Sequence, residues 1–119
     1  MKEGLEKRFA DAIKLQKDNQ LELARNLLLE LAQQDPRSVR ILAALGSVYY
    51  DLGAWDEAAS VFRRGIAIAP TLEGISKGLF HSLWKLERWV EALEEVKRFQ
   101  AVSNSDDYLR IIEEINEKW

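Results

Sequence analysis

The sequence contains no cysteine, one histidine and two prolines among its 119 residues. Without cysteine the chain forms no disulfide, no thiolate zinc site and no cysteine nucleophile, which is typical of proteins in a reducing compartment. No apolar run approaches the ~18 residues that a membrane-spanning helix requires. The opening segment MKEGLEKRF also lacks the apolar centre of a signal peptide. We therefore expect a cytoplasmic protein that has no membrane segment.

An excess of one charge is also missing. The formal net charge is −3, and no local cluster of lysine and arginine stands out. Because a nucleic-acid-binding surface needs concentrated positive charge, we expect no nucleic-acid partner. Apolar residues make up 47% of the chain and charged residues 31%, as is usual for a folded soluble protein. The length favours a single domain over residues 1–119.

The groups that catalysis or metal binding would need are equally sparse. The single histidine, His81, has no metal-ligating residue three or four positions away. Adjacent carboxylates such as Glu94 and Glu95 point apart on a helix, so they read as solvated surface. The chain has neither a glycine-rich phosphate loop nor a nucleophile elbow. We expect a protein that is not an enzyme and binds no metal or cofactor.

An internal repeat organises what the sequence does contain. The two prolines, Pro36 and Pro70, lie 34 residues apart. Coincident spacings of this kind identify a repeat architecture before any local assignment is made. The same spacing connects Ala24, Ala58 and Ala92; Leu21, Trp55 and Trp89; and Leu28, Phe62 and Val96.

Within one period the apolar residues follow helical spacing in two stripes. Between the stripes of the middle unit lies Gly53, a residue that readily adopts the positive φ of a helix C-terminus. Asn19 and Glu87 occupy the corresponding turns of the other units. Each unit is therefore predicted to be two antiparallel helices, the second one ended by proline where proline is present. The stripes of the middle unit are Leu42, Leu45, Tyr49 and Leu52, then Trp55, Ala58, Phe62 and Ile66.

The middle unit, residues 39–72, resembles the tetratricopeptide repeat. The resemblance extends over residues 5–38 and 73–106, and an amphipathic segment at about 107–119 is interpreted as a capping helix. The resemblance implies an all-α fold, a right-handed superhelix of antiparallel helix pairs with about seven helices. The residues that carry the resemblance are Leu42, Leu45, Gly46, Tyr49, Trp55, Ala58, Phe62 and Pro70.

Small and large residues of the repeat predict how its helices pack. Gly46 lacks a side chain, so the two helices of the middle pair can approach closely. In the third unit Phe80 stands at this position, and Gly78 is expected to relieve the crowding unless that pair splays apart. Trp55 and Trp89, at the start of second helices, are predicted to lie in the core.

The family resemblance also implies a binding groove lined by the first helix of each pair. Small residues, among them Ala43 and Ala44, line its middle, and a peptide backbone can approach there. The first-repeat end is apolar and the third-repeat end is cationic and aromatic, which predicts a protein or peptide partner with an apolar anchor and acidic residues. The predicted groove residues are Phe9, Ile13, Lys17, Arg40, Ala44, Ser47, Tyr50, Lys77, His81, Trp84 and Lys85.

One partner class of such grooves is not expected here. The clamp for the acidic C-termini of heat-shock chaperones uses asparagine, lysine and arginine side chains, and none of these stands at the corresponding positions. Those positions are Phe9, Ile13, Ala44, Gly74 and Gly78.

Three functions remain open from the sequence. The leading one is a non-catalytic protein-interaction module. The second is a small chaperone for an exported or unstable client, and the third is a self-assembling scaffold. Leu23 and Leu29 fall outside the apolar stripe of their helix, and exposed apolar residues often mark interfaces. A homodimer through this edge of the N-terminal repeat is therefore also considered.

Overall fold

The computed structural model describes residues 3–118, in which seven α-helices and no strands are found. The prediction of an all-α fold with seven helices is confirmed. Residues 1, 2 and 119, which belong to the predicted domain and final helix, lie outside the described part of the chain. The helices are α1 (Glu3–Lys17), α2 (Leu21–Gln34), α3 (Val39–Asp51), α4 (Trp55–Ile68), α5 (Glu73–Lys85), α6 (Trp89–Val102) and α7 (Asp106–Lys118).

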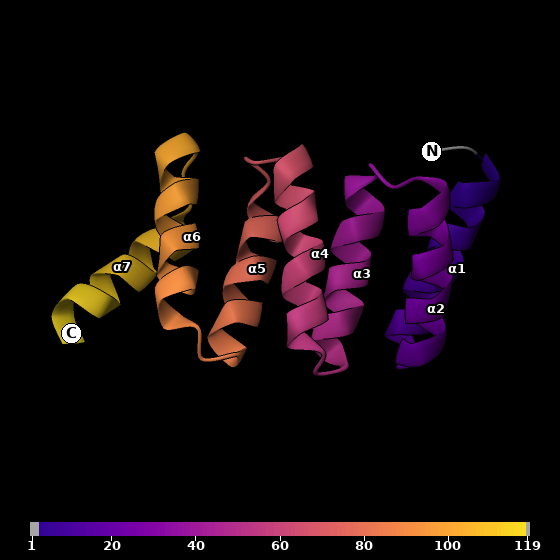
Figure 1. Ribbon diagram of the computed structural model, residues 1–119, viewed down its shortest axis with the longest axis horizontal. Helices are drawn as coiled ribbons and strands as arrows, with labels where there is room; N and C mark the ends of the chain where they lie inside the picture. Colours follow the sequence, from indigo (N-terminus) through magenta and orange to yellow (C-terminus); the bar gives the residue numbers. More distant parts are fainter. Residues whose placement is uncertain (1–2, 119) are drawn as a thin grey trace.

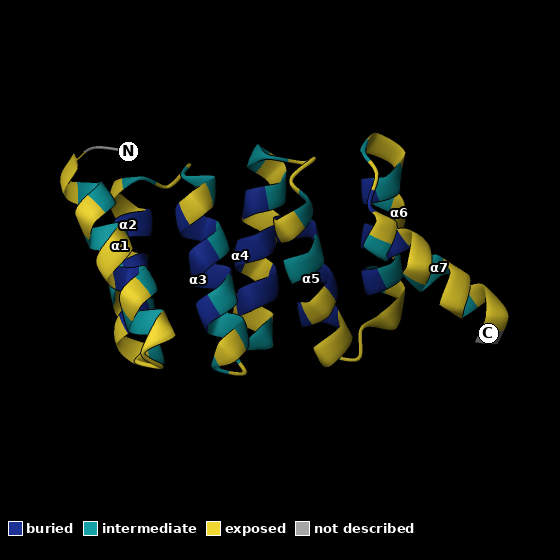
Figure 2. Cartoon of the chain, turned by 180° about the vertical axis from the view of Figure 1, so that it is seen from behind, coloured by how far each residue is buried: buried dark blue, intermediate teal, exposed yellow. Residues whose placement is uncertain are grey.

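Three helical hairpins stand side by side in chain order, and α7 diverges from the last of them (Figure 1). The resulting row measures 49 × 26 × 19 Å. The first helices are neighbours, since α3 contacts both α1 and α5. Figure 2 shows buried stripes along the hairpin helices, whereas α7 is largely exposed or half-buried. The first helices α1, α3 and α5 therefore form one side of the row.

The three hairpin turns have one backbone conformation. Asn19, Gly53 and Glu87 all have positive φ, at 60°, 77° and 60°. In the middle turn the Gly53 N–H donates to the Tyr50 carbonyl at 3.0 Å and the Ala54 N–H to the Tyr49 carbonyl at 2.9 Å. This pair of bonds is the Schellman motif, which satisfies carbonyls at a helix C-terminus. The predicted turn positions are confirmed.

Glu87 is the costliest of these three turn residues, which gives a stability prediction. Placing a non-glycine residue in the left-handed region costs roughly 1–2 kcal/mol, and the extra unfolded-state freedom of glycine offsets roughly 0.5–1 of this. We expect Glu87→Gly to raise the free energy of unfolding in urea by about 0.5–1 kcal/mol. The reverse change at the matched turn, Gly53→Ala, should lower it. A loss of stability in Glu87→Gly would show that the exposed glutamate makes a contact worth more than the strain.

The ring of Phe62 passes between two neighbouring first helices because each offers a glycine to it. A Cβ on Gly46 of α3 would lie 2.6 Å from the Phe62 ring, and one on Gly78 of α5 would lie 2.5 Å from it. Both distances are far inside van der Waals contact. The space at Gly46 is thus taken by Phe62. Gly78 serves the same ring, so the expectation that it relieves crowding around Phe80 needs correction.

In the third hairpin, Phe80 is buried by packing against α7. Phe80 is buried at 5% exposure and packs against Tyr108, with ring centroids 5.9 Å apart. Tyr108 is fully buried and also meets Phe99 edge-on at 5.6 Å. The aromatic residue at the small-residue position is therefore enclosed by the first turns of α7.

The two repeat tryptophans differ in burial, and the core prediction for Trp89 is wrong. Trp55 is half-buried, and Lys85 Nζ lies 5.7 Å from its ring centre. Trp89 is 41% exposed and rests edge-on against Trp84 at 4.5 Å. The physical reason is its place at the first residue of α6, beside the α5–α6 turn, where its aromatic neighbour Trp84 is itself 36% exposed.

The N-terminal repeat exposes the two leucines that stood outside the apolar stripe. Leu23 is 54% exposed and Leu29 is 38% exposed. Six residues of α-helix rotate by about 600°, so these side chains point about 120° apart. They do not form one continuous apolar surface, which weakens the case for a dimer through this edge.

Candidate functional site

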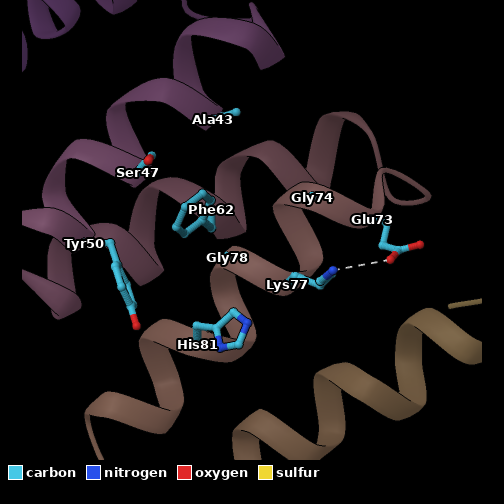
Figure 3. Close-up of a pocket in the computed structure, with 9 residues that line it drawn as sticks. All are labelled: Ala43, Ser47, Tyr50, Phe62, Glu73, Gly74, Lys77, Gly78 and His81. Atoms are coloured by element: carbon cyan, nitrogen blue, oxygen red, sulfur yellow. Dashed lines mark ion pairs between the residues drawn. The ribbon is translucent and has the colours of Figure 1, made fainter. Parts of the chain in front are cut away.

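A pocket of about 620 Å³ lies between α3 and α5. We call it the central pocket. In Figure 3 the Phe62 ring lies between the two helices, with the side chains of α3 on one side and those of α5 on the other. The residues that line it are Ala43, Ser47 and Tyr50 of α3, Phe62 of α4, and Glu73, Gly74, Lys77, Gly78 and His81 of α5.

Helical spacing places these residues on two facing stripes. On α3 the lining residues recur after four and then three positions, and on α5 after three or four, so each set occupies one helix face. Three of them, Ala43, Gly74 and Gly78, have a methyl group or no side chain at all. The small residues leave room for a chain segment, and Phe62 supplies an apolar wall.

A second pocket of about 400 Å³ lies between α1 and α3, and we call it the α1 pocket. Arg40 spans its edge, since its Nη1 lies 3.0 Å from Glu6 Oε1 and its guanidinium lies 4.8 Å from the Phe9 ring centre. The α1 pocket is lined by Glu6, Phe9, Ala10, Ile13, Lys14, Lys17 and Arg40.

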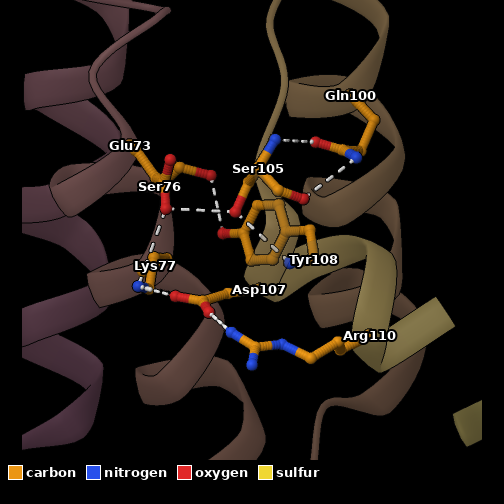
Figure 4. A network of polar contacts seen from close by, with 8 residues as sticks. All are labelled: Glu73, Ser76, Lys77, Gln100, Ser105, Asp107, Tyr108 and Arg110. Atoms are coloured by element: carbon orange, nitrogen blue, oxygen red, sulfur yellow. Dashed lines mark hydrogen bonds and ion pairs between the residues drawn. The ribbon is translucent and has the colours of Figure 1, made fainter. Parts of the chain in front are cut away.

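The charged groups beside the central pocket form one connected chain (Figure 4). Lys77 Nζ lies 2.5 Å from Asp107 Oδ2 and 3.7 Å from Glu73 Oε2. Asp107 also pairs with Arg110. The hydrogen bond to Asp107 raises the pKa of Lys77, and the same bond holds the pKa of Asp107 below its ordinary value. Lys77 is therefore charged and already engaged by α7.

His81 is the titratable group of the central pocket whose ordinary pKa lies closest to neutrality. Desolvation at the pocket wall lowers its pKa, and the positive charge of Lys77 lowers it further. Both causes disfavour the imidazolium form. At pH 7 His81 is consequently a neutral imidazole that can donate one hydrogen bond and accept another.

A buried polar network fixes α7 next to the pocket. Ser76 Oγ donates to Glu95 Oε2 at 2.6 Å and lies 2.7 Å from the Tyr108 hydroxyl. Since the single Ser76 proton goes to the carboxylate, Tyr108 must donate to Ser76. Arg98 completes the network with bonds of 2.8 and 2.7 Å to Glu95. Burial raises the pKa of Tyr108, so the hydroxyl stays protonated as this network requires.

The N-terminus of α7 is tied to the pocket rim by a side-chain cap. The Tyr108 N–H donates to Ser105 Oγ at 3.2 Å, which is an N-cap contact. The Ser105 hydroxyl in turn donates to Glu73 Oε2 at 3.1 Å. Two rim residues of the central pocket, Glu73 and Lys77, are thus held by the first turn of α7.

Most of the predicted groove residues line one of the two pockets, although their role in binding stays a prediction. Phe9, Ile13, Lys17 and Arg40 line the α1 pocket. Ser47, Tyr50, Lys77 and His81 line the central pocket.

Three predicted groove residues lie elsewhere. Ala44 is only 8% exposed and packs in the core, because it points one helical position away from Ala43. Trp84 stacks on Phe80 at 5.5 Å near the α5–α6 turn, and Lys85 covers Trp55. None of the three lines the central pocket or the α1 pocket.

Sequence reasoning missed the aromatic wall and the rim of the central pocket. Phe62 was assigned to packing alone, yet the glycines facing it from α3 and α5 indicate a ring that projects from α4 between these two helices and reaches the pocket. Gly74 lies four residues before Gly78, and this small-residue stripe was the signal for an open helix face.

The described residues bear on two other kinds of feature, a metal site and a membrane-spanning helix. Between residues 3 and 118, no three histidine or carboxylate side chains gather in a way that would hold a metal ion. Among the same residues, every helix is too short or too polar to cross a membrane.

Comparison with known proteins identifies the architecture. A family model described as tetratricopeptide repeat matches residues 9–73. The solved structure of MamA AMB-1 superposes with a TM-score of 0.75 at 21% identity, over 82% of this chain and 54% of that one. The Yersinia enterocolitica type III secretion translocator chaperone SycD gives 0.79 at 17% identity, over 98% of this chain and 89% of that one. No curated protein sequence matches the chain.

The likeness to these structures is one of fold, a right-handed superhelix of antiparallel helix pairs. The chain spans about half the length of MamA AMB-1, at 54%. The architecture expected from the repeat is confirmed.

Proposed function

The chain belongs to the tetratricopeptide repeat family, and from this premise we propose that it is a non-catalytic interaction module that receives a segment of a partner protein. We call the central pocket and the α1 pocket together the groove. The observation that carries the proposal is the central pocket, where small residues on α3 and α5 leave about 620 Å³ open above an aromatic wall.

The pocket has the size and character of a site for one anchoring side chain and its backbone. Its volume lies within the roughly 300–1,000 Å³ of typical ligand sites. A leucine- or phenylalanine-sized side chain that becomes buried against Phe62 contributes about 1.5–3 kcal/mol through removal of apolar surface from water. Ser47, Tyr50 and His81 at the rim supply hydrogen-bonding groups that orient the segment. Such an anchor carries most of the affinity of an interface.

Filling the pocket at Gly74 tests the proposal. Gly74 lines the pocket, and a Cβ on it would have no neighbour within 4 Å, so the backbone there accepts a side chain. We expect Gly74→Gln to weaken binding by at least about tenfold, a loss of about 1.4 kcal/mol. The measurement is the dissociation constant of peptides selected on the wild-type protein from a displayed library of random linear peptides.

Gly4→Gln is the matched control. Gly4 is also a helical glycine with no neighbour within 4 Å of its Cβ position, and it lines neither pocket. Both changes replace glycine in a helix, so neither should lower the melting temperature. If the selected peptides bind Gly74→Gln as well as wild type, or if no peptide is selected, the groove is not the binding site.

A chaperone for an exported or unstable client is the second candidate. The observation that favours it is the superposition with SycD, a translocator chaperone by its title, over 98% of this chain. An apolar pocket of this kind can shield a client segment from aggregation as well as recruit a partner. Client solubility during co-expression separates the two roles, because an adaptor has no effect on it.

Self-association is the weakest candidate, since Leu23 and Leu29 do not share one surface. The cytoplasmic location expected from the sequence stays a prediction.

A further inference from the structure

The two pockets of the groove differ in how their cations are held. At the central pocket, Lys77 stands in the chain of Glu73, Lys77, Asp107 and Arg110. Two carboxylates and two cations alternate in this chain, so it carries no net charge. His81 adds none, because its pKa is lowered and the imidazole is neutral at pH 7. The central pocket therefore offers an apolar wall and little attraction for an acidic side chain.

The α1 pocket has the opposite character. Three cations, Lys14, Lys17 and Arg40, line it together with one carboxylate, Glu6. Glu6 is paired with Arg40. In the part of the chain that the structure describes, no ion pair involves Lys14 or Lys17. An acidic side chain that enters here meets an excess of positive charge.

Both pockets border the same helix, which fixes their separation. Arg40 lines the α1 pocket and Ala43 lines the central pocket. These residues lie one helical turn apart on α3. A segment that crosses α3 from one pocket to the other covers about one interhelical distance, ~8–10 Å. An extended chain covers that distance in about three residues.

We propose that the groove selects an extended segment with an apolar side chain in the central pocket and an acidic side chain about three residues away in the α1 pocket. Asp107 determines this arrangement, because it neutralises the positive charge beside the central pocket. The inference rests on the proposed function and names the chemistry of its partner. It also reverses the charge polarity expected from the sequence, in which the third-repeat end was the cationic one.

Asp107 acts through Lys77, as a positioning residue for the groove charge. It lies on α7, outside both pockets, and its carboxylate lies 2.5 Å from the ammonium group of Lys77, which lines the central pocket. Removing the carboxylate charge leaves Lys77 with Glu73 alone at 3.7 Å and leaves Arg110 without its partner. The chain of charges beside the central pocket then has an excess positive charge, from Lys77 and Arg110 against Glu73, and attracts an acidic side chain of its own.

Parallel library selections test the inference on the complete chain. The same displayed library of random linear peptides is selected on wild type, on the double variant K14E/K17E, on Asp107→Asn and on the control K7E/K97E. Lys7 and Lys97 are exposed and line neither pocket. The control therefore matches the change in total charge without altering the groove.

The wild-type and control selections should enrich an apolar residue with aspartate or glutamate about three positions away. The K14E/K17E selection should enrich lysine or arginine at that position. Peptides that were selected on the wild-type protein should bind this variant on the order of tenfold more weakly at low salt. Asp107→Asn should add a second acidic preference next to the apolar anchor.

The inference is overturned if peptides selected on K14E/K17E keep the acidic residue, or if peptides selected on the wild type show no preference for one. If Gly74→Gln still weakens binding of the peptides selected on the wild type, the proposed function stands although the inference about charge fails. If Gly74→Gln leaves binding intact, the proposed function fails as well. An Asp107→Asn selection identical to that of wild type overturns the role of Asp107 alone.

Discussion

Phe62→Ala is expected to lower the free energy of unfolding by about 3–5 kcal/mol, the usual cost of truncating a buried phenylalanine. The ring is 5% exposed and fills the space between Gly46 and Gly78. Because one side of it borders the central pocket, water can enter the vacated space, and we expect the lower end of this range. A domain of this size has only about 5–15 kcal/mol in total. Urea unfolding followed by circular dichroism measures the loss.

Alanine substitution at Gly46 or Gly78 tests this packing further, because its effect on the free energy of unfolding should change sign when Phe62 is removed. In the wild type, alanine at Gly46 or Gly78 overpacks against the ring at a cost of about 1–3 kcal/mol, which exceeds or equals the ~1 kcal/mol gained in helix propensity. In the Phe62→Ala background the clash is absent, so each alanine should stabilise the protein. A double-mutant cycle isolates the coupling.

Additive effects in that cycle would contradict the packing described for Phe62. They would mean that the ring moves aside at no cost, and the pocket wall it forms would then not be a fixed feature of the groove.

Tyr108→Ala is expected to detach α7 and leave the first two hairpins folded. The fully buried ring packs on Phe80 and Phe99, and its hydroxyl joins the network of Ser76 and Glu95. Truncation of such a residue costs about 3–5 kcal/mol. Because each unit of a repeat stack contacts only its neighbours, the loss stays local.

Hydrogen exchange distinguishes local from global loss in Tyr108→Ala. The amides of α7 should exchange freely while those of α1 to α4 keep their protection. Tyr108→Phe is the matched control, because it keeps the ring and removes one hydrogen bond worth about 1 kcal/mol. Uniform loss of protection in Tyr108→Ala would show that α7 is integral to the whole stack.

The repeat made the fold accessible from sequence. A 34-residue spacing of prolines and apolar residues predicted hairpins, and the second helices begin at Leu21, Trp55 and Trp89 as that spacing requires. The turn positions followed from local backbone chemistry. These features depend on residues close together in the chain, which is why pattern reasoning recovers them.

The electrostatics of the groove depended on contacts that no local pattern contains. The sequence alone indicates that Lys77 is a free cation. In the structure, α7 packs beside it and places Asp107, 30 positions later in the sequence, at its ammonium group. Both Ala43 and Ala44 were expected in the groove, yet only Ala43 lines the central pocket, and Ala44, one position further along the helix, packs in the core. Exposure of Trp89 likewise depends on the tertiary packing at the start of α6, which the repeat spacing does not contain.

The edge-on pair of Trp84 and Trp89 gives the third hairpin an optical signature. Indole rings with centres 4.5 Å apart are close enough for their electronic transitions to couple, and we expect this coupling to produce a paired band in the circular dichroism spectrum. The two rings belong to α5 and α6 and meet across the turn at Glu87. Separation of these helices would abolish the band while the helical signal of the other hairpins persists, so the molecule reports the opening of its third repeat without any attached label.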